Sequence, residues 1–323
     1  MEPRRKRRMY SLGIALALLV VLIVALVMRF HAPPEVARLL PESDAIVYMN
    51  LKTVRAATHF DEKPVAPSAE YAKFLDGTGF RWDRDLDRIA VSLHRMPDPN
   101  GPNGVVAYTG VMEGRFDTEK LASYLKQNSV ATENYAGHDV YTIPGNEGRV
   151  LRVSALGYDM VAASNMPTPE QIHSVIDRYA TGASPFSGSS LLSLRYREVP
   201  LFALAWGIGH VGLPFSDRGN IQVFGVTLPM SEDTDFIASL AFRGSLALRV
   251  EELAPTEQDA AQTAMNLTSI LNLVRGFTQG SNTPQDVAVQ QAFASLKVKQ
   301  EKSRVVITGD LSRSVLTAAA GAK

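Results

Sequence analysis

The chain has 323 residues, of which 33 are Lys or Arg, 33 are Asp or Glu and none is Cys. Without cysteine the protein forms no disulfides and has no thiolate chemistry, so packing must stabilise its fold. The first eight residues hold five of the basic and one of the acidic residues. The remaining chain is therefore slightly acidic, which argues against nucleic acid as a partner.

An apolar run at residues 10–28 follows a basic tail at residues 1–9. The run contains no charged residue, and as a helix of about 28 Å it matches the hydrocarbon core of a bilayer. It predicts a transmembrane signal anchor, with the lipid bilayer as its partner. The basic residues in front of it predict a cytoplasmic N-terminus and an exported C-terminal domain. These residues are Arg4, Arg5, Lys6, Arg7 and Arg8.

A cleaved secretory signal is the alternative interpretation of this segment. The run ends in VALVMRFHAPPE, where no A-x-A site precedes Pro33 and Pro34, so we expect the segment to be retained. An exported domain without cysteine is more typical of bacteria than of secreted eukaryotic proteins. We therefore expect a single-pass protein of the bacterial inner (cytoplasmic) membrane.

Three prolines at residues 29–42 predict a short juxtamembrane linker. A first α+β half is expected at residues 43–198. Its opening strand, at residues 43–51, is apolar on both sides, which predicts an interior strand with other elements on both faces. The next helix is expected to end at Gly77.

Turn residues and caps predict the rest of the first half. Strands at residues 88–94 and 104–113 flank a Pro- and Gly-rich turn, which indicates a hairpin. Asp117 is the expected N-cap of the following helix, and four short strands joined by tight turns predict a meander. The helix after the meander is expected to have Thr168 as its N-cap.

The second half, at residues 199–323, has a similar order of elements. Strand-like segments lead to a long helix from Thr256 to about Phe277, and another helix is expected at Thr283. A hairpin that turns near Lys302 and a terminal helix complete the chain. Hairpins and meanders followed by helices predict an α+β fold with antiparallel sheets. Two similar halves are one interpretation of this order.

Short motifs give the chain a resemblance to functionally unassigned bacterial envelope proteins with one N-terminal span. The segments that carry the resemblance are PESDAIVYMNL, FDTEKL, YAGHDVYTI, DMVAAS and PTPEQI. The resemblance covers most of residues 39–316. It implies an exported α+β domain behind an anchor, and it implies no catalytic residues.

The sequence offers no pattern typical of a cofactor or metal site. The six histidines never occur as H-x-H, H-x-x-x-H or H-E-x-x-H, and no phosphate-binding glycine loop is present. We therefore predict no cofactor, no metal and no catalytic residue. Asp83, Asp85 and Asp87 alternate with arginines, which favours a solvated turn with local ion pairs over a cation site.

One match to a catalytic motif is rejected on context. Residues 123–126 fit the S-x-x-K pattern of penicillin-binding enzymes. Those enzymes place the serine at a helix N-terminus and need S-D-N and K-T-G elements. Ser123 is instead expected inside a helix, and neither further element occurs in the chain.

The most apolar exported segment is VPLFALAWGIGHVGLPF, residues 199–215. We expect a buried strand from Leu201 to Ile208 followed by a loop. An alternative hypothesis makes this segment an apolar loop that contacts lipid or a partner through Trp206, His210 and Phe215.

Two functions remain open on this evidence. The first is a noncatalytic, membrane-anchored envelope domain that binds a protein, glycan or lipid, or acts as a scaffold. The second is an exported hydrolase whose site is assembled from dispersed residues. Converging polar groups with perturbed ionisation in a pocket would favour the hydrolase, and a smooth surface with an apolar groove would favour the binding domain.

Overall fold

The computed structural model describes residues 19–20, 32–62, 68–182, 188–210, 220–223, 226–229, 233–242, 245–277, 290–291 and 293–311. The predicted basic tail and, apart from Leu19 and Val20, the predicted anchor lie outside this part of the chain. The helices predicted at Thr283 and at the C-terminus also lie outside it. No helix within the described residues combines the length and the apolarity needed to cross a membrane.

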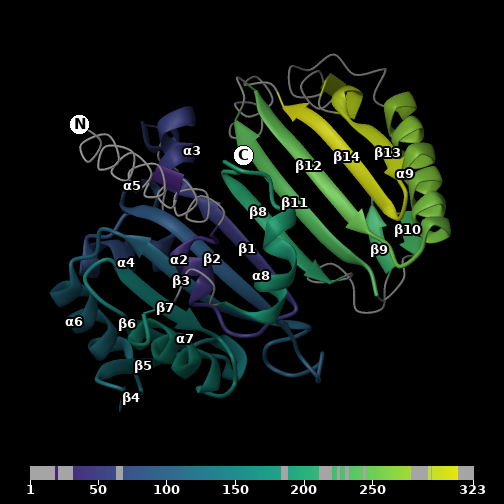
Figure 1. Cartoon of the computed structure of the whole chain (residues 1–323). Helices are drawn as coiled ribbons and strands as arrows, with labels where there is room; N and C mark the ends of the chain where they lie inside the picture. Colours follow the sequence, from purple (N-terminus) through teal and green to yellow (C-terminus); the bar gives the residue numbers. More distant parts are fainter. Residues whose placement is uncertain are drawn as a thin grey trace, which may run out of the picture.

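Twelve of the described strands form one antiparallel sheet, and helices pack against both of its faces (Figure 1). The α+β class with antiparallel strands is therefore confirmed. The order across the sheet is β13-β14-β12-β11-β8-β1-β2-β3-β7-β6-β5-β4. Consequently, the first strands of the two halves, β1 and β8, are neighbours in the middle of the sheet.

The strands of the first half are β1 (Ala45–Asn50), β2 (Leu86–Arg95), β3 (Val106–Gly114), β4 (Ala131–Tyr135), β5 (His138–Pro144), β6 (Val150–Ala155) and β7 (Met160–Ser164). Those of the second half are β8 (Ala205–His210), β11 (Asp235–Phe242), β12 (Leu246–Leu253), β13 (Lys297–Glu301) and β14 (Arg304–Leu311). A separate hairpin consists of β9 (Asn220–Val223) and β10 (Val226–Pro229).

The described α-helices are α2 (Glu35–Arg38), α3 (Leu51–Thr58), α4 (Ala69–Thr78), α5 (Trp82–Asp85), α6 (Thr118–Asn128), α7 (Glu170–Ala180), α8 (Ser190–Arg195) and α9 (Glu257–Phe277). Short 3-10 turns are η1 (Phe60–Glu62), η2 (Asn146–Gly148) and η3 (Tyr196–Glu198).

Strand order is similar in the two halves. In the first half, β1, β2 and β3 are consecutive neighbours, α6 follows, and the last strand, β7, returns beside β3. In the second half, β8, β11 and β12 are consecutive neighbours, α9 follows, and the last strand, β14, returns beside β12. Because β1 and β8 pair in antiparallel fashion, the two halves extend in opposite directions from the middle of the sheet.

The largest core lies on the side of the sheet that carries Ile46, here called the Ile46 face. Helices α2, α7 and α8 cover it in the first half and at the middle of the sheet. The sheet and these three helices all contribute fully buried residues. Each aliphatic side chain removed from water stabilises the fold by about 1.5–3 kcal/mol. The largest of these side chains are Leu39, Leu40, Ile46, Ile172, Ile176, Leu192, Ile208 and Ile237.

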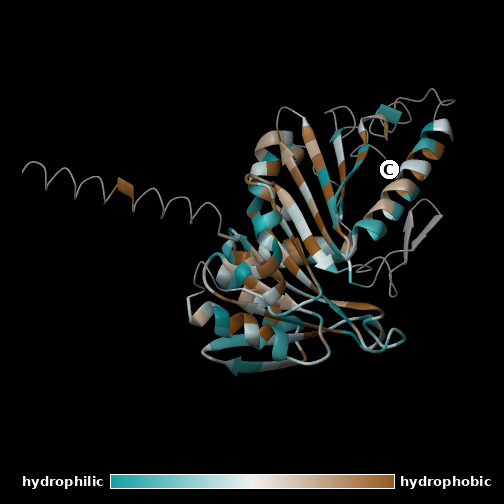
Figure 2. Cartoon of the chain, turned by 45° about the vertical axis from the view of Figure 1, so that its right-hand side comes forward, coloured by the Kyte–Doolittle hydropathy of each residue, from teal (hydrophilic) through white to brown (hydrophobic). Residues whose placement is uncertain are grey.

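The opposite side, here called the Met49 face, carries α3, α4 and α6 in the first half and α9 in the second. Helix α6 begins as predicted, because the Asp117 carboxylate accepts a hydrogen bond from the Lys120 N–H at 3.1 Å. Leu121 and Leu125 are then buried against the sheet. Figure 2 shows α9 as a mixture of hydrophobic and hydrophilic residues along the edge of the sheet.

The predicted linker at residues 29–42 differs from the structure in its second part. Helix α2 lies within it, and Val36, Ala37, Leu39 and Leu40 are fully buried in the main core. The reason is visible in the sequence VARLL, whose apolar residues find a surface on β2 and β3. The segment that connects the core to the predicted anchor is therefore only residues 29–34.

Two predicted helix boundaries shift by one residue each. Helix α4 continues past Gly77 and ends at Thr78, with Gly79 as a left-handed cap at φ 71°. Gly77 instead makes room for an aromatic ring, since an added Cβ would lie 2.4 Å from Cδ2 of Tyr124. The N-cap of α7 is Pro169 rather than Thr168, a one-residue shift.

Three strand predictions also change. β1 is interior, as predicted, but Val47 on its Met49 face is exposed because its neighbour on β8 is Gly207, which has no side chain. β8 begins at Ala205 rather than Leu201. Among the strand-like segments expected before the long helix, residues 221–228 (IQVFGVTL) are predicted as one strand, whereas β9 and β10 pair there as a hairpin. The hairpin turn near Lys302 is confirmed.

Candidate functional site

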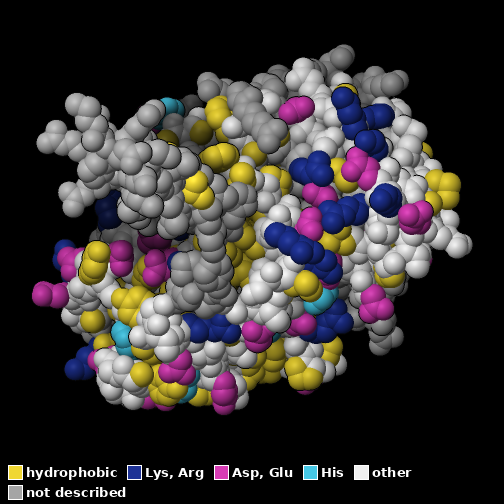
Figure 3. Space-filling model, viewed as in Figure 1, with side chains coloured by type: hydrophobic (Ala, Val, Ile, Leu, Met, Phe, Trp, Pro, Cys, Tyr) yellow, Lys and Arg dark blue, Asp and Glu magenta, His cyan; other side chains and the backbone are white. Residues whose placement is uncertain are grey.

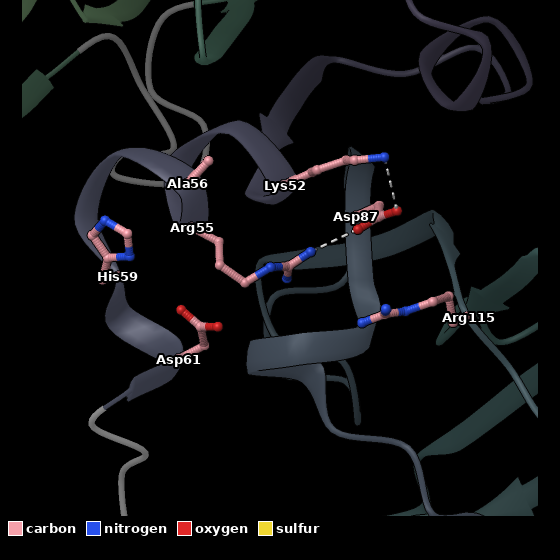
Figure 4. Close-up of a pocket in the computed structure, with 7 residues that line it drawn as sticks. All are labelled: Lys52, Arg55, Ala56, His59, Asp61, Asp87 and Arg115. Carbon is pink, nitrogen blue, oxygen red and sulfur yellow. Dashed lines mark hydrogen bonds and ion pairs between the residues drawn. The ribbon is translucent and has the colours of Figure 1, made fainter.

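A cleft of about 400 Å³ lies at the end of the sheet where β1 leads into α3 (Figure 4). It is built by helix α3, by the η1 turn that follows it, by the α5–β2 junction and by the start of the loop after β3. The cleft is lined by Lys52, Arg55, Ala56, His59, Asp61, Asp87 and Arg115.

Helix α3 places three of these side chains on one side. The Asn50 side chain caps the helix by accepting a hydrogen bond from the Thr53 N–H at 3.0 Å. Lys52, Arg55 and His59 then follow at spacings of three and four residues, which brings them onto the same helix face. His59 ends the helix in the left-handed conformation at φ 53°.

Arg55 forms the fixed base of the cleft. Its Nη1 donates to the backbone carbonyls of Asp83 and Leu86, both at 3.1 Å, and its Nη2 donates to Oδ1 of Asp87 at 2.7 Å. Only 14% of the side chain is exposed. Because three acceptors hold the guanidinium, its position is set before any ligand arrives.

Lys52 and Arg115 form the rim, and their side chains are 69% and 68% exposed. Lys52 Nζ lies 3.9 Å from Oδ2 of Asp87, and Arg115 Nη2 lies 3.0 Å from Oδ1 of Asp85. The lining holds three cations and two carboxylates, Asp61 and Asp87, and a third carboxylate, that of Asp85, pairs with Arg115 beside it. This arrangement suits a small anionic group such as a carboxylate or a phosphate.

The carboxylates of residues 83–87 are ion-paired, but only one of their partners is local in sequence, since Arg115 and Arg55 lie 30 and 32 residues from Asp85 and Asp87. Asp83 pairs with Arg81, Asp85 with Arg115 and Asp87 with Arg55. The hydrogen bond from Arg81 lowers the pKa of Asp83. Asp83 is buried rather than solvated. Among the described residues, no group of three His, Asp or Glu side chains is placed to hold a metal ion.

A second hollow, of about 520 Å³, lies on the Ile46 face of β11, β12 and β14, beside η3. Figure 3 shows basic and acidic side chains interspersed over this region. Arg304 Nη1 donates to Glu198 at 3.0 Å and approaches Glu251 at 3.4 Å, while Arg249 Nε donates to Glu251 at 2.7 Å. The bond from Arg304 lowers the pKa of Glu198. Here the ions satisfy one another within the protein.

The residues predicted to contact lipid or a partner are placed differently from one another. Trp206 is only 3% exposed and stacks on Tyr48 with a centroid distance of 5.4 Å. His210 ends β8, where Nδ1 lies 2.5 Å from Oδ1 of the buried Asp235. Phe215 lies outside the described residues, as do the five basic residues from Arg4 to Arg8.

Ser123, which fits the S-x-x-K pattern, and Ser92, which lies beside a histidine, both occupy structural positions. Ser123 lies inside α6, as predicted. Ser92 Oγ lies 3.2 Å from Nε2 of His94, but Ser92 is fully buried and its hydroxyl donates to the carbonyl of Thr109 at 3.0 Å. Burial lowers the pKa of His94. In this conformation the pair is a polar link between β2 and β3, out of reach of a substrate.

The cleft residues Lys52, Arg55 and Arg115 are not identified by sequence reasoning. A helical spacing signal exists in LKTVRAATH, where Lys52, Arg55 and His59 share a face. Their carboxylate partner, Asp87, lies 32 residues beyond Arg55. Only the folded chain brings these groups together.

Comparisons with known proteins assign no family. No family model matches the chain, and no curated protein matches it. Among solved structures, crystal forms IV, III and I of TP0453 are similar at 11%, 11% and 10% identity, with TM-scores of 0.47, 0.48 and 0.45. The matches cover 90%, 89% and 89% of this chain and 97%, 97% and 96% of the other. Similarity at this level assigns no function.

Proposed function

We propose that the chain is a single-pass, membrane-anchored protein of the bacterial cell envelope whose exported α+β domain binds a ligand through an anionic group. In this proposal the domain is a binding module rather than an enzyme. The anchor is residues 10–28, the N-terminus is cytoplasmic, and the ligand is a component of the envelope. The two similar halves are proposed to be duplicated units, in keeping with their matching strand order.

The observation that supports binding is the geometry of the α3 cleft. Arg55 is held in place by three acceptors, and the exposed cations Lys52 and Arg115 stand on the rim. A fixed guanidinium with two exposed cations beside it can contact an anionic group without rearrangement of the backbone. Arginines that ion pairs hold in place can orient and bind a ligand, as a binding site requires.

Titration of the full chain with inorganic phosphate and with acetate tests the site. We expect weak binding of at least one of the two anions, measured by isothermal titration calorimetry in mild detergent. Lys52→Ala and Arg115→Ala should each weaken it by about tenfold, the value of a charged hydrogen bond. Lys126→Ala and Lys297→Ala, exposed lysines on α6 and β13, are the charge-matched controls. Equal binding by all four variants would overturn the assignment of the cleft.

Protease treatment of whole spheroplasts tests the topology. The proposal expects the C-terminal domain to be digested from outside while the cells stay intact. If the domain survives until lysis, it is cytoplasmic and the proposed localisation is wrong. N-terminal sequencing of the membrane fraction separates a retained anchor from a cleaved signal, because cleavage would give a chain that begins near Pro33.

A further inference from the structure

Several exposed aromatic side chains lie at one end of the central strands, here called the α3 end. The end is defined by Asn50, where β1 passes into α3, and by the adjacent starts of β2 and β8 (Figure 1). The turn before β8 lies here, since Asn50 N–H donates to the carbonyl of Leu204 at 2.7 Å. The β6–β7 turn also lies here, since Gly114 N–H donates to the carbonyl of Asp159 at 2.8 Å.

Three aromatic rings project from these segments. Phe202 is 82% exposed and Tyr158 is 81% exposed, while Trp82 on α5 is partly exposed and stacks on Phe60. Leu201 is exposed beside Phe202. An exposed leucine alone needs no explanation, but a group of protruding aromatic rings at one end of a domain is typical of an interaction surface.

Phe202 has an unfavourable backbone conformation. The turn from Pro200 to Ala203 is closed by a hydrogen bond from Ala203 N–H to the Pro200 carbonyl at 3.2 Å. Phe202 occupies its third position with φ 65°, which strongly favours glycine. Left-handed backbone at a bulky residue costs about 1–2 kcal/mol, and the exposed ring recovers little of this by packing. A role outside the fold would explain why an aromatic ring stands at this position.

Cations lie at the same end. Lys52 and Arg115 form the rim of the cleft, and both side chains are exposed. Aromatic rings at the level of the headgroups, together with Lys and Arg that pair with lipid phosphates, are the pattern of a membrane interface.

The tether is short. If the anchor ends at Met28, residues 29–34 join it to the buried core at Val36. Six extended residues span at most about 20 Å, which is about twice the diameter of one helix with its side chains. The domain is thus held beside the bilayer, so lipid is the partner that its exposed rings meet at the highest local concentration.

We propose that the α3 end of the sheet docks on the surface of the bilayer, with Phe202 and Leu201 inserted among the headgroups and with Lys52 and Arg115 paired with lipid phosphates. The α3 cleft then receives the phosphate of an anionic headgroup. This inference rests on the proposed membrane anchor, and it names the ligand class of the proposed binding site.

Because the chain has no native cysteine, single-cysteine labelling of the full protein tests the proposal directly. Phe202→Cys, Val130→Cys and Leu19→Cys variants are labelled with the fluorophore NBD and reconstituted into vesicles that contain phosphatidylglycerol and a doxyl-labelled lipid. Val130 is an exposed control at the opposite end of the sheet, before β4, and Leu19 reports on the anchor. We expect quenching at positions 202 and 19 and not at position 130.

The outcomes separate the inference from the proposed function. Quenching at position 19 without quenching at position 202 would overturn the docking surface and leave the anchor standing. Absence of quenching at position 19 would remove the anchor and the docking surface together. In the 202-labelled protein, Lys52→Ala and Arg115→Ala should each lower the ratio of docked to undocked domain about fivefold. No change on replacing both would refute the role of phosphate pairing.

A second variant guards against a purely structural role for the ring. Phe202→Gly relieves the left-handed backbone, so the melting temperature of the full chain should stay the same or rise. Labelling at the neighbouring Leu201→Cys should then show reduced quenching in the Phe202→Gly background. A lower melting temperature would mean that the ring stabilises the fold instead, and would overturn the proposal.

Discussion

The two halves of the sheet follow the same order of strands but are covered differently. In the first half helices lie on both faces, whereas in the second half α9 covers the Met49 face and the Ile46 face of β12 and β14 carries ions. Ala90 and Val111 occupy the Ile46 face on β2 and β3, while Arg249 and Glu251 occupy it on β12. Strand order therefore does not decide which faces are buried; the alternating side chains do.

This difference predicts unequal stability within one sheet. The core of the first half is a continuous cluster of large aliphatic side chains, whereas the α9 core consists mainly of Ala254, Ala260 and Val305. Four experiments test the comparison, in order of decreasing effect.

Truncation of core residues should show the largest contrast. Ile176→Ala on α7 removes a fully buried side chain and should lower the free energy of unfolding by about 2–5 kcal/mol. Leu267→Ala on α9 removes a partly buried one and should cost about 1 kcal/mol. Urea unfolding of the full chain in detergent measures both. Equal losses would mean that the two halves are packed equally well.

The buried carboxyl beneath α9 should make the second half sensitive to pH. Glu252 is 3% exposed, accepts a hydrogen bond from Thr263 at 3.1 Å, and has a second oxygen without a hydrogen-bond partner in the described structure. Burial raises its pKa from 4.5 to about 7. The folded protein thus holds this proton more tightly than the unfolded chain does.

The sign follows from this difference. The contribution of Glu252 protonation to the free energy of unfolding is fully present below pH 4.5. It is lost as the pH rises to 7, and the total change is roughly 3 kcal/mol. Glu252→Gln should remove this dependence, as measured by unfolding at several pH values. A variant with the same pH profile as the wild type would contradict the assignment to Glu252.

The ion network on the open face should contribute less. Arg304→Ala leaves Glu198 with Arg197 alone, at 3.4 Å, and Glu251 with Arg249 alone, so the expected cost is about 1–3 kcal/mol. Arg197→Ala removes only the exposed contact to Glu198 and, as the comparison variant, should change stability by less than about 0.5 kcal/mol. The destabilisation caused by Arg304→Ala should decrease at high salt, because salt screens the ion pairs. An equal effect of both substitutions would mean that the network does not stabilise this face.

Helix caps should show no contrast between the halves, because capping is local. Asp117 caps α6, and Thr256 Oγ accepts a hydrogen bond from the Asp259 N–H at 3.1 Å at the start of α9. Asp117→Ala and Thr256→Ala should each cost about 1 kcal/mol. Thermal melting of the two variants checks this, and a clear difference would show that packing rather than capping is being measured.

The sequence predicts local features better than distant ones. The Asp117 cap, the turn at Lys302 and the span of α9 follow from residues close to one another, and the structure confirms them. The pairing of Arg55 with Asp87 and the burial of Val36 depend on contacts between distant segments, which a single sequence does not contain. In residues 199–215 the hypothesis of an apolar contact named Trp206 and Phe215; Trp206 is buried, Phe215 lies outside the described residues, and within the described part of this segment Phe202 is the exposed ring.

The seam between β1 and β8 has a consequence for how the chain acquires its structure. At this seam the backbones approach so closely that a Cβ at position 209 would lie 2.6 Å from Cβ of Ala45, and the strands exchange hydrogen bonds across 160 residues of sequence. Until residues 205–210 have been synthesised, β1 presents an uncovered row of donors and acceptors. A chain halted at residue 198 should therefore be prone to self-association, and the two halves should fold as partners rather than in succession.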